Sequence, residues 1–277
     1  MASIRPSRIS PEVRWFVERA PSLRGGLLPL GGIVIVLGLS WAYLAYMAWG
    51  MENMDVAAVW WLMPRMSNWG GADLALVFAM WAIMMAAMML PAAIPLLLLL
   101  ARSNLKRYSR VRALLATSAS GLGYVTAWGA FSALATLAQW GLLEARLVSP
   151  MMASSSPYLS ALLLAAAGAY QFTALKYACL SQCRSPLSAL MTQKRDGITG
   201  AFLLGLGQGA YCTGCCWLLM ALLFVLGVMN LLWISVLTLL VLLEKFLHQP
   251  RWFVRLTGAA LLVWSALVVG QAMSLLG

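Results

Sequence analysis

Charged residues are scarce in this chain of 277 residues. Asp, Glu, Lys and Arg make up 10% of it, whereas a soluble domain carries about a quarter. Acidic residues are scarcest, at 8 against 19 Lys and Arg, and there is a single His. No long polar stretch is left to form a separate soluble domain. These shortages exclude an ordinary soluble globular protein.

Catalytic signatures are also lacking. The sequence contains no Walker loop, no dinucleotide-binding glycine fingerprint, no H-E-x-x-H motif and no recognisable Ser/His/Asp set. The basic N-terminal residues are not interleaved with aromatic residues in the way that nucleic-acid binding favours, so no nucleic-acid partner is expected.

Long apolar stretches are what the chain does have, because 62% of its residues are hydrophobic. About 20 apolar residues in a helix cross a hydrocarbon core of about 30 Å. The sequence therefore predicts an all-α, polytopic transmembrane bundle, with a basic tail over residues 1–24 and one transmembrane domain over 25–277. Seven spans are expected, at residues 27–49, 73–100, 113–141, 158–178, 199–226, 229–247 and 256–276.

Basic residues indicate the orientation of these spans. With seven spans, all Lys and Arg except Arg65 and Arg146 fall on one side. Because cytoplasmic loops are enriched in Lys and Arg, this predicts a cytoplasmic N-terminus and a periplasmic C-terminus. The net charge of +11 is thereby explained by topology. The expected location is the lipid bilayer of a bacterial inner membrane.

Three cysteines in the fifth predicted span form the main candidate site. At about 100° per residue, Cys212, Cys215 and Cys216 share one helix face about 100° wide. Gln208 lies on the same face. Gly205 and Gly209 lie beside it and would let another helix approach closely.

Methionines in the second span lie at matching depths. Met84 is as deep as Cys216, and Met88 is as deep as Cys212, if the two helices are neighbours. Met220 completes the sulfur-bearing set. Methionine is also a common gap-filling core residue, so simple packing is the alternative interpretation.

Thiolate and thioether sulfur together select soft ions, above all Cu(I), and thiolate-rich sites also suit Zn(II). No His and no Asp within the spans lies near the cysteines, which argues against a site for Mg or Ca. Packing alone gives no reason to choose sulfur three times within five residues.

A second pair of thiols ends the fourth span. Cys179 and Cys183 share a helix face with Lys176 if the helix continues, and Lys176 and Arg184 would favour their thiolate forms. The pair is either an inner station for a metal ion or two thiols without a role.

Glu244 is an ionisable residue inside the sixth span, where a partner is expected. One alternative is an ion pair with Lys176, which lies at a similar depth. The other is a local pair with Lys245 at the membrane interface.

Four motifs in order resemble an uncharacterised bacterial family of predicted metal-binding integral membrane proteins, over roughly residues 70–247. They are the Trp81–Pro91 segment, the segment from Gln171 to Arg184, the Cys212–Trp217 segment, and Gly227 to Asn230 followed by Glu244 and Lys245. The resemblance implies a multi-spanning inner-membrane protein with a metal site. Relatives often carry His where this chain has Gln208. The departure removes a candidate nitrogen ligand and implies either an all-sulfur site or a weaker site here.

The leading functional hypothesis is a membrane protein that binds Cu(I) for transport or for delivery to a partner that donates or accepts the metal. One alternative is a membrane thiol–disulfide oxidoreductase that exchanges electrons with quinone. The other is a non-catalytic assembly or scaffold subunit of an oligomeric membrane complex, whose Cys and Met only pack.

Overall fold

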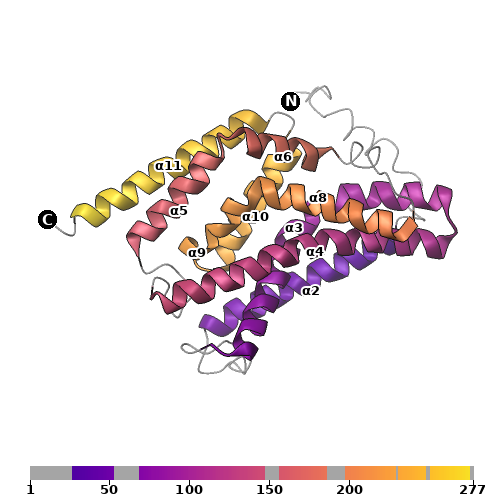
Figure 1. Cartoon of the computed structure of the whole chain (residues 1–277), viewed down its shortest axis with the longest axis horizontal. Helices are drawn as coiled ribbons and strands as arrows, with labels where there is room; N and C mark the ends of the chain where they lie inside the picture. The colour runs from indigo at the N-terminus through magenta and orange to yellow at the C-terminus, as the bar shows by residue number, and fades with distance from the viewer. Residues whose placement is uncertain are drawn as a thin grey trace, which may run out of the picture.

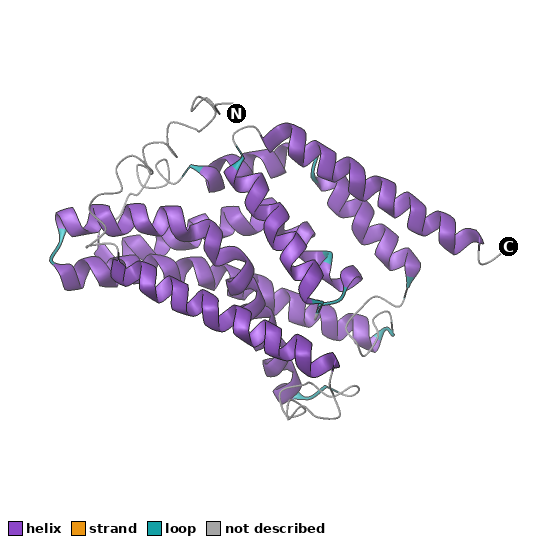
Figure 2. Cartoon of the chain, turned by 180° about the vertical axis from the view of Figure 1, so that it is seen from behind, coloured by secondary structure: helices purple, strands orange, loops and turns teal. Residues whose placement is uncertain are grey.

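The computed structural model describes residues 27–52, 69–146, 156–185, 197–228, 230–247 and 250–274. The predicted basic tail over residues 1–24 lies outside this part of the chain. Within it, every regular element is a helix, as Figure 2 shows from behind. The all-α class is therefore confirmed for the described residues.

The described residues form nine helices. They are α2 (Leu27–Glu52), α3 (Gly71–Arg107), α4 (Arg110–Glu144), α5 (Pro157–Tyr170), α6 (Ala174–Arg184), α8 (Gly197–Ala221), α9 (Leu223–Leu226), α10 (Leu231–Phe246) and α11 (Pro250–Ser274).

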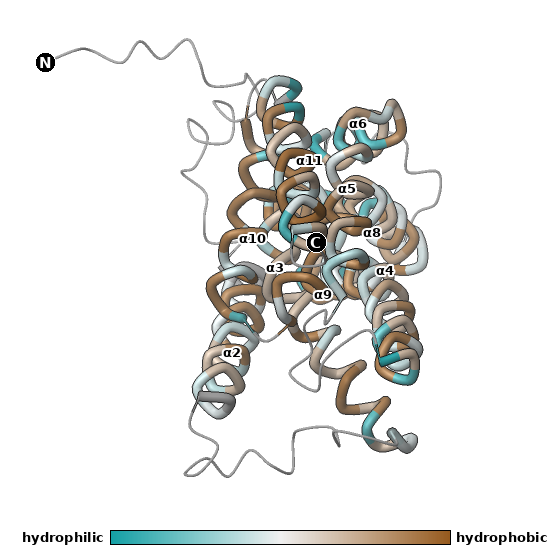
Figure 3. Tube along the Cα trace, turned by 90° about the vertical axis from the view of Figure 1, so that its left-hand side faces the viewer, coloured by the Kyte–Doolittle hydropathy of each residue, from teal (hydrophilic) through white to brown (hydrophobic). Residues whose placement is uncertain are grey.

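The helices form two groups (Figure 1). In one, α4 packs closely on both α3 and α8, and α2 lies against α3; in the other, α5 pairs with α11. The short α9 and α10 lie between them. One buried cluster of apolar side chains runs through both groups. Figure 3 shows apolar residues along most of the helical traces, with hydrophilic ones gathered on α6 and at helix ends.

Fewer helices than predicted have the length and composition of a membrane span. Five qualify in the described part of the chain: the Gly31–Gly50 segment of α2, α3, α4, α8 with α9, and α11. The bent pair of α5 and α6 makes a sixth if it counts as one span. The remaining predicted span, 229–247, corresponds to α10, whose 16 residues extend for about 24 Å.

The fourth predicted span is not a continuous helix. The sequence predicts one helix over 158–178, but α5 ends at Tyr170 and α6 begins at Ala174, with a bend of 66° between them. Thr173 creates the break, because its Oγ1 donates to the carbonyl of Tyr170 and accepts from the backbone N–H of Lys176. A side chain that caps a helix in this way competes with helix continuation.

Glycines bring α8 against α4, as their spacing predicts. A Cβ at Gly205 would overlap the carbonyl oxygen of Ser120, and one at Gly209 would lie 2.7 Å from the Cβ of Ala127. The backbones meet because these positions lack side chains. The neighbour is α4, however, whereas α3 makes no extended backbone contact with α8 in the described residues.

A turn joins α9 to α10, where the sequence predicts one. Gly227 has φ 91°, which favours glycine, and the side chain of Asn230 accepts hydrogen bonds from Leu232 and Trp233 at the start of α10. After this turn α10 packs on α3, α11 and α6 as much as on α8. Helix α10 therefore does not pack mainly against α8.

Candidate metal centre

Four thiols from two helices meet in the interior. Cys183 comes from the last turn of α6, and Cys212, Cys215 and Cys216 come from the middle of α8. The side chain of Cys183 interacts with those of Cys212 and Cys215, and so does the side chain of Cys216. All four are buried and carry no disulfide. These residues are called the thiol cluster below.

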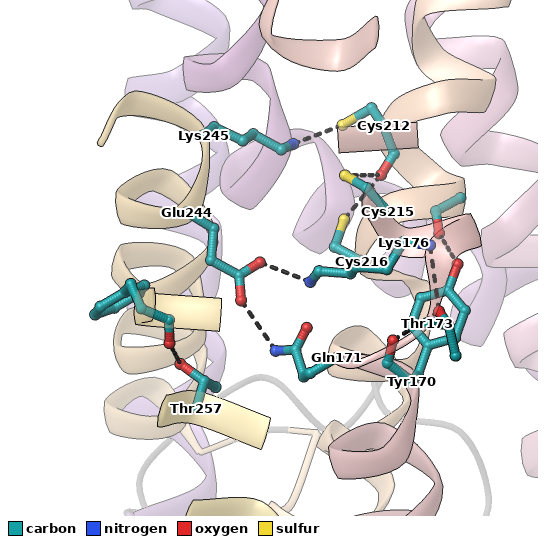
Figure 4. Close-up of polar contacts among 12 residues, drawn as sticks. Tyr170, Gln171, Thr173, Lys176, Cys212, Cys215, Cys216, Glu244, Lys245 and Thr257 are labelled. Atoms are coloured by element: carbon teal, nitrogen blue, oxygen red, sulfur yellow. Dashed lines mark hydrogen bonds and ion pairs between the residues drawn. The ribbon is translucent and has the colours of Figure 1, made fainter. Parts of the chain in front are cut away.

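Two of these thiols are turned toward their own helix. Cys215 Sγ and Cys216 Sγ donate to the carbonyl oxygen of Cys212, at 3.1 Å and 3.0 Å (Figure 4). In this arrangement no group of three or more His, Cys, Asp or Glu side chains in the described residues is positioned to hold a metal ion. A metal on three or more of these sulfurs therefore requires rotation of side chains. The donor chemistry nevertheless fits a soft ion, because all four donors are thiol sulfur.

Two polar groups contact Cys212 directly. Lys245 Nζ donates to Cys212 Sγ across 2.8 Å, and the hydroxyl of Tyr124 lies 2.9 Å from the same sulfur. The Tyr124 hydroxyl also donates to the carbonyl oxygen of Met89 on α3, at 2.9 Å. Tyr124 thus connects α3 to the thiol cluster, and Lys245 brings a buried ammonium group to it.

The fifth cysteine lies beside the thiol cluster. Cys179 is half-buried on α6, one turn before Cys183, and its Sγ packs over the backbone of Gly214. Cys183 is held in place by Gln208, whose Nε2 donates to the Cys183 carbonyl at 2.9 Å. The predicted inner station is therefore divided: Cys183 joins the three thiols of α8, and Cys179 packs outside them.

A separate polar network surrounds Glu244. Its carboxylate accepts from Lys176 Nζ at 2.7 Å and from Gln171 Nε2 at 2.9 Å, and all three side chains are buried. The ion pair between Glu244 and Lys176 is thus the alternative that the structure contains. It joins the bend between α5 and α6 to the last turn of α10.

The cation beside the thiols is not the one that the sequence predicts. Lys176 is paired with Glu244, and Arg184 donates from Nε to the Lys245 carbonyl at 2.9 Å and from a terminal nitrogen to the Leu247 carbonyl. Both cations face the end of α10, and an effect of either one on the thiolates stays a prediction. Lys245 takes the position beside the thiols instead.

The methionines share the core with the thiol cluster. Met84, Met88 and Met220 are fully buried and belong to the same apolar cluster as the three cysteines of α8. The hydroxyl of Tyr124 contacts both Met89 on α3 and Cys212 on α8. This contact is consistent with the similar depths predicted for the methionines of α3 and the cysteines of α8. A role as metal ligands remains a prediction.

Lys245 and Tyr124 are the site residues that sequence reasoning missed. Both lie far along the chain from Cys212, so no local spacing connects them. The available signals were an ionisable residue next to Glu244 and a tyrosine within a predicted span. A buried lysine needs a counter-charge, and a buried tyrosine hydroxyl needs a hydrogen-bond partner.

Fold and site together define an all-α protein with long apolar helices and a buried cluster of thiols suited to a soft metal ion. Residues 78–268, more than half of the chain, match the family model described as "PpoB2: Copper chaperone". The chain belongs to this copper chaperone family, which associates it with copper handling. No curated protein and no solved structure matches it.

Proposed function

We propose that this chain is a multi-pass membrane protein that binds Cu(I) on the thiol cluster and moves it across the bilayer or delivers it to a partner protein. The observation that carries the proposal is the convergence of Cys183 with Cys212, Cys215 and Cys216 in a chain of a copper chaperone family. Thiolate sulfur prefers Cu(I) among the common biological ions.

The surface supports a location in the bilayer. Large apolar side chains are exposed on several long helices, such as Leu39 on α2, Leu134 on α4 and Leu267 on α11, each with at least 60% of its surface accessible. Lipid accommodates such a surface, whereas extended apolar patches are unusual on soluble monomers. The segregation of Lys and Arg favours a cytoplasmic N-terminus and a periplasmic C-terminus in a bacterial inner membrane.

Copper binding would use sulfur that is already close together. Rotation of the Cys215 and Cys216 side chains away from the Cys212 carbonyl would direct their thiols to a shared ion. Met84, Met88 and Met220 would serve as weaker thioether ligands on the route to the cluster. Delivery to a partner protein is ligand exchange among thiolates and needs no redox step.

The test is Cu(I) binding by the whole protein, purified anaerobically in lipid nanodiscs. Titration against a Cu(I) chelator of known affinity gives the dissociation constant, and mass spectrometry gives the copper content. The double substitution Cys212→Ser/Cys216→Ser is expected to weaken binding by more than about a hundredfold, because Ser oxygen is a poor ligand for Cu(I). Unchanged affinity and stoichiometry in this variant would refute the proposal.

Cys179→Ser is the matched control. It makes the same substitution on α6, at the half-buried thiol beside the cluster, and is expected to keep Cu(I) affinity within about threefold of the wild type. Zn(II) is titrated in parallel to identify the ion. Capture of a mixed disulfide with another protein, without copper binding, would favour the oxidoreductase alternative. If the protein neither bound copper nor formed a mixed disulfide, the scaffold alternative would be favoured.

A further inference from the structure

We propose that Lys245 is the fixed counter-ion of the copper complex, and that it favours Cu(I) held by two thiolates. This inference rests on the proposed function and specifies the number of thiolate ligands at that site. It assigns a role in copper binding to a residue outside the set of sulfur ligands.

The charge of Lys245 is balanced by sulfur. Its side chain is buried, its Nζ lies 2.8 Å from Cys212 Sγ, and its ammonium interacts electrostatically with all four thiols of the cluster. The neighbouring carboxylate, Glu244, is occupied by Lys176 and Gln171. Within the described segments the buried ion pair at the end of α10 is that of Lys176 with Glu244, so the carboxylate does not neutralise Lys245.

The position of Lys245 is fixed by its backbone. Arg184 donates from Nε to the Lys245 carbonyl at 2.9 Å, and the preceding residue, Glu244, is fastened to α6 through Lys176. These contacts hold the last turn of α10 against α6, which also carries Cys183. The ammonium group is therefore held beside the thiol cluster by contacts that do not involve a metal ion.

Charge counting then favours one complex. The ammonium of Lys245 and a Cys212 thiolate sum to zero. When Cu(I) binds Cys212 and a second thiol, the proton of that thiol leaves to water, and the bis-thiolate complex carries one negative charge. Lys245 cancels this charge, so the buried site is neutral before and after binding. The candidates for the second ligand are Cys183 and Cys216, because the side chains of both interact with that of Cys212.

Other ligand numbers leave a charge in the interior. Cu(I) on three thiolates would leave the site with Lys245 at one negative charge. A divalent ion on two thiolates would leave it at one positive charge, and it needs a third thiolate to be neutral. Without Lys245, the two-thiolate Cu(I) complex would itself carry an uncompensated negative charge. An unpaired charge is strongly disfavoured in a buried environment, so Lys245 favours two thiolates for Cu(I).

The experiment measures the Cu(I) affinities of Lys245→Met, Lys245→Gln and Lys245→Arg in nanodiscs. The two neutral substitutions are expected to weaken Cu(I) binding by about 30-fold or more. Lys245→Arg restores the charge and is expected to bind Cu(I) within about fivefold of the wild type. X-ray absorption of the copper-loaded wild type is expected to give two thiolate ligands.

The matched control is Lys106→Met, which makes the same substitution at an exposed lysine in the last turn of α3. Its Cu(I) affinity is expected to stay within about threefold of the wild type, because this side chain is not part of the site. Wild-type Cu(I) affinity in folded Lys245→Met and Lys245→Gln, or three thiolate ligands in the wild type, would overturn the inference. If Cys212→Ser/Cys216→Ser also left copper binding intact, the proposed function itself would fail.

Discussion

Two buried lysines meet at the last turn of α10, Lys176 from α6 and Lys245 from α10 itself, and they are neutralised in different ways. Lys176 meets the carboxylate of Glu244 at 2.7 Å, with Gln171 completing the hydrogen bonds. Lys245 meets the sulfur of Cys212 at 2.8 Å. Oxygen binds a soft metal ion poorly, so the first pair stays a structural link. Sulfur is the preferred ligand of such an ion, so under the proposed function the second pair would exchange its contact for the metal.

Gly205→Ala is expected to have the largest effect, because it disrupts the contact between α4 and α8 that positions Cys212. The added Cβ would overlap the backbone of Ser120, so α4 and α8 must separate. We expect a loss of more than about 4 kcal/mol in stability, seen as a loss of folded protein in thermal unfolding or size-exclusion chromatography.

Gly207→Ala is the control for that substitution. It lies on the same helix, and a Cβ there meets nothing within 4 Å. It should change stability by less than about 1 kcal/mol, in the stabilising direction, because Ala favours helix. Equal behaviour of the two variants would contradict the close approach of α4 and α8.

Glu244→Gln is expected to have the next largest effect, because it leaves the Lys176 ammonium buried without a counter-charge. The expected loss is about 3–5 kcal/mol. Adding Lys176→Met should recover part of it, and a double-mutant cycle by chemical unfolding measures the coupling. Additive losses would show that the two side chains do not interact as an ion pair.

Cys183→Ser tests whether one thiol of α6 belongs to the same centre as those of α8. We expect Cu(I) affinity to fall by about tenfold or more, with little change in unfolding temperature. Cys179→Ser, four residues earlier, should bind copper as the wild type does. Identical affinities in the two variants would separate Cys183 from the site.

Met84→Leu is expected to have the smallest effect. Leu has a similar volume, so packing should change by less than about 1.5 kcal/mol. Cu(I) affinity should fall about twofold to threefold if the thioether is a secondary ligand, because thioethers are weaker ligands than thiolates. A loss as large as that of Cys183→Ser would instead make Met84 a principal ligand.

The sequence predicts much of the fold because the strongest signals are local. Apolar length places the helices, and the spacing of Gly205 and Gly209 predicts a closely packed face on α8. It misses the break between α5 and α6, since neither Gln171 nor Thr173 is a strong helix breaker. That break depends on capping by Thr173 and on a contact from Gln171 to Glu244, 73 residues away.

Prediction of the site is limited in the same way. Three cysteines on one turn and a half of α8 are visible in the sequence, because helical geometry relates them. The arrival of Cys183 and Lys245 depends on how α6 and α10 pack around α8. Local spacing carries no information on that packing, so Lys176 was the obvious cation near the thiols and Lys245 was not.

The attachment of α6 to α10 has a mechanical consequence. One ion pair joins the first turn of α6 to α10, and the guanidinium of Arg184 joins its last turn to the carbonyl groups where α10 ends. Because both ends of α6 are fastened to the C-terminal end of α10, we expect α6 and this end of α10 to move together. Cys183 and Lys245, one on each helix, would then advance or retreat from α8 together, so a ligand and its charge partner reach the ion in the same displacement.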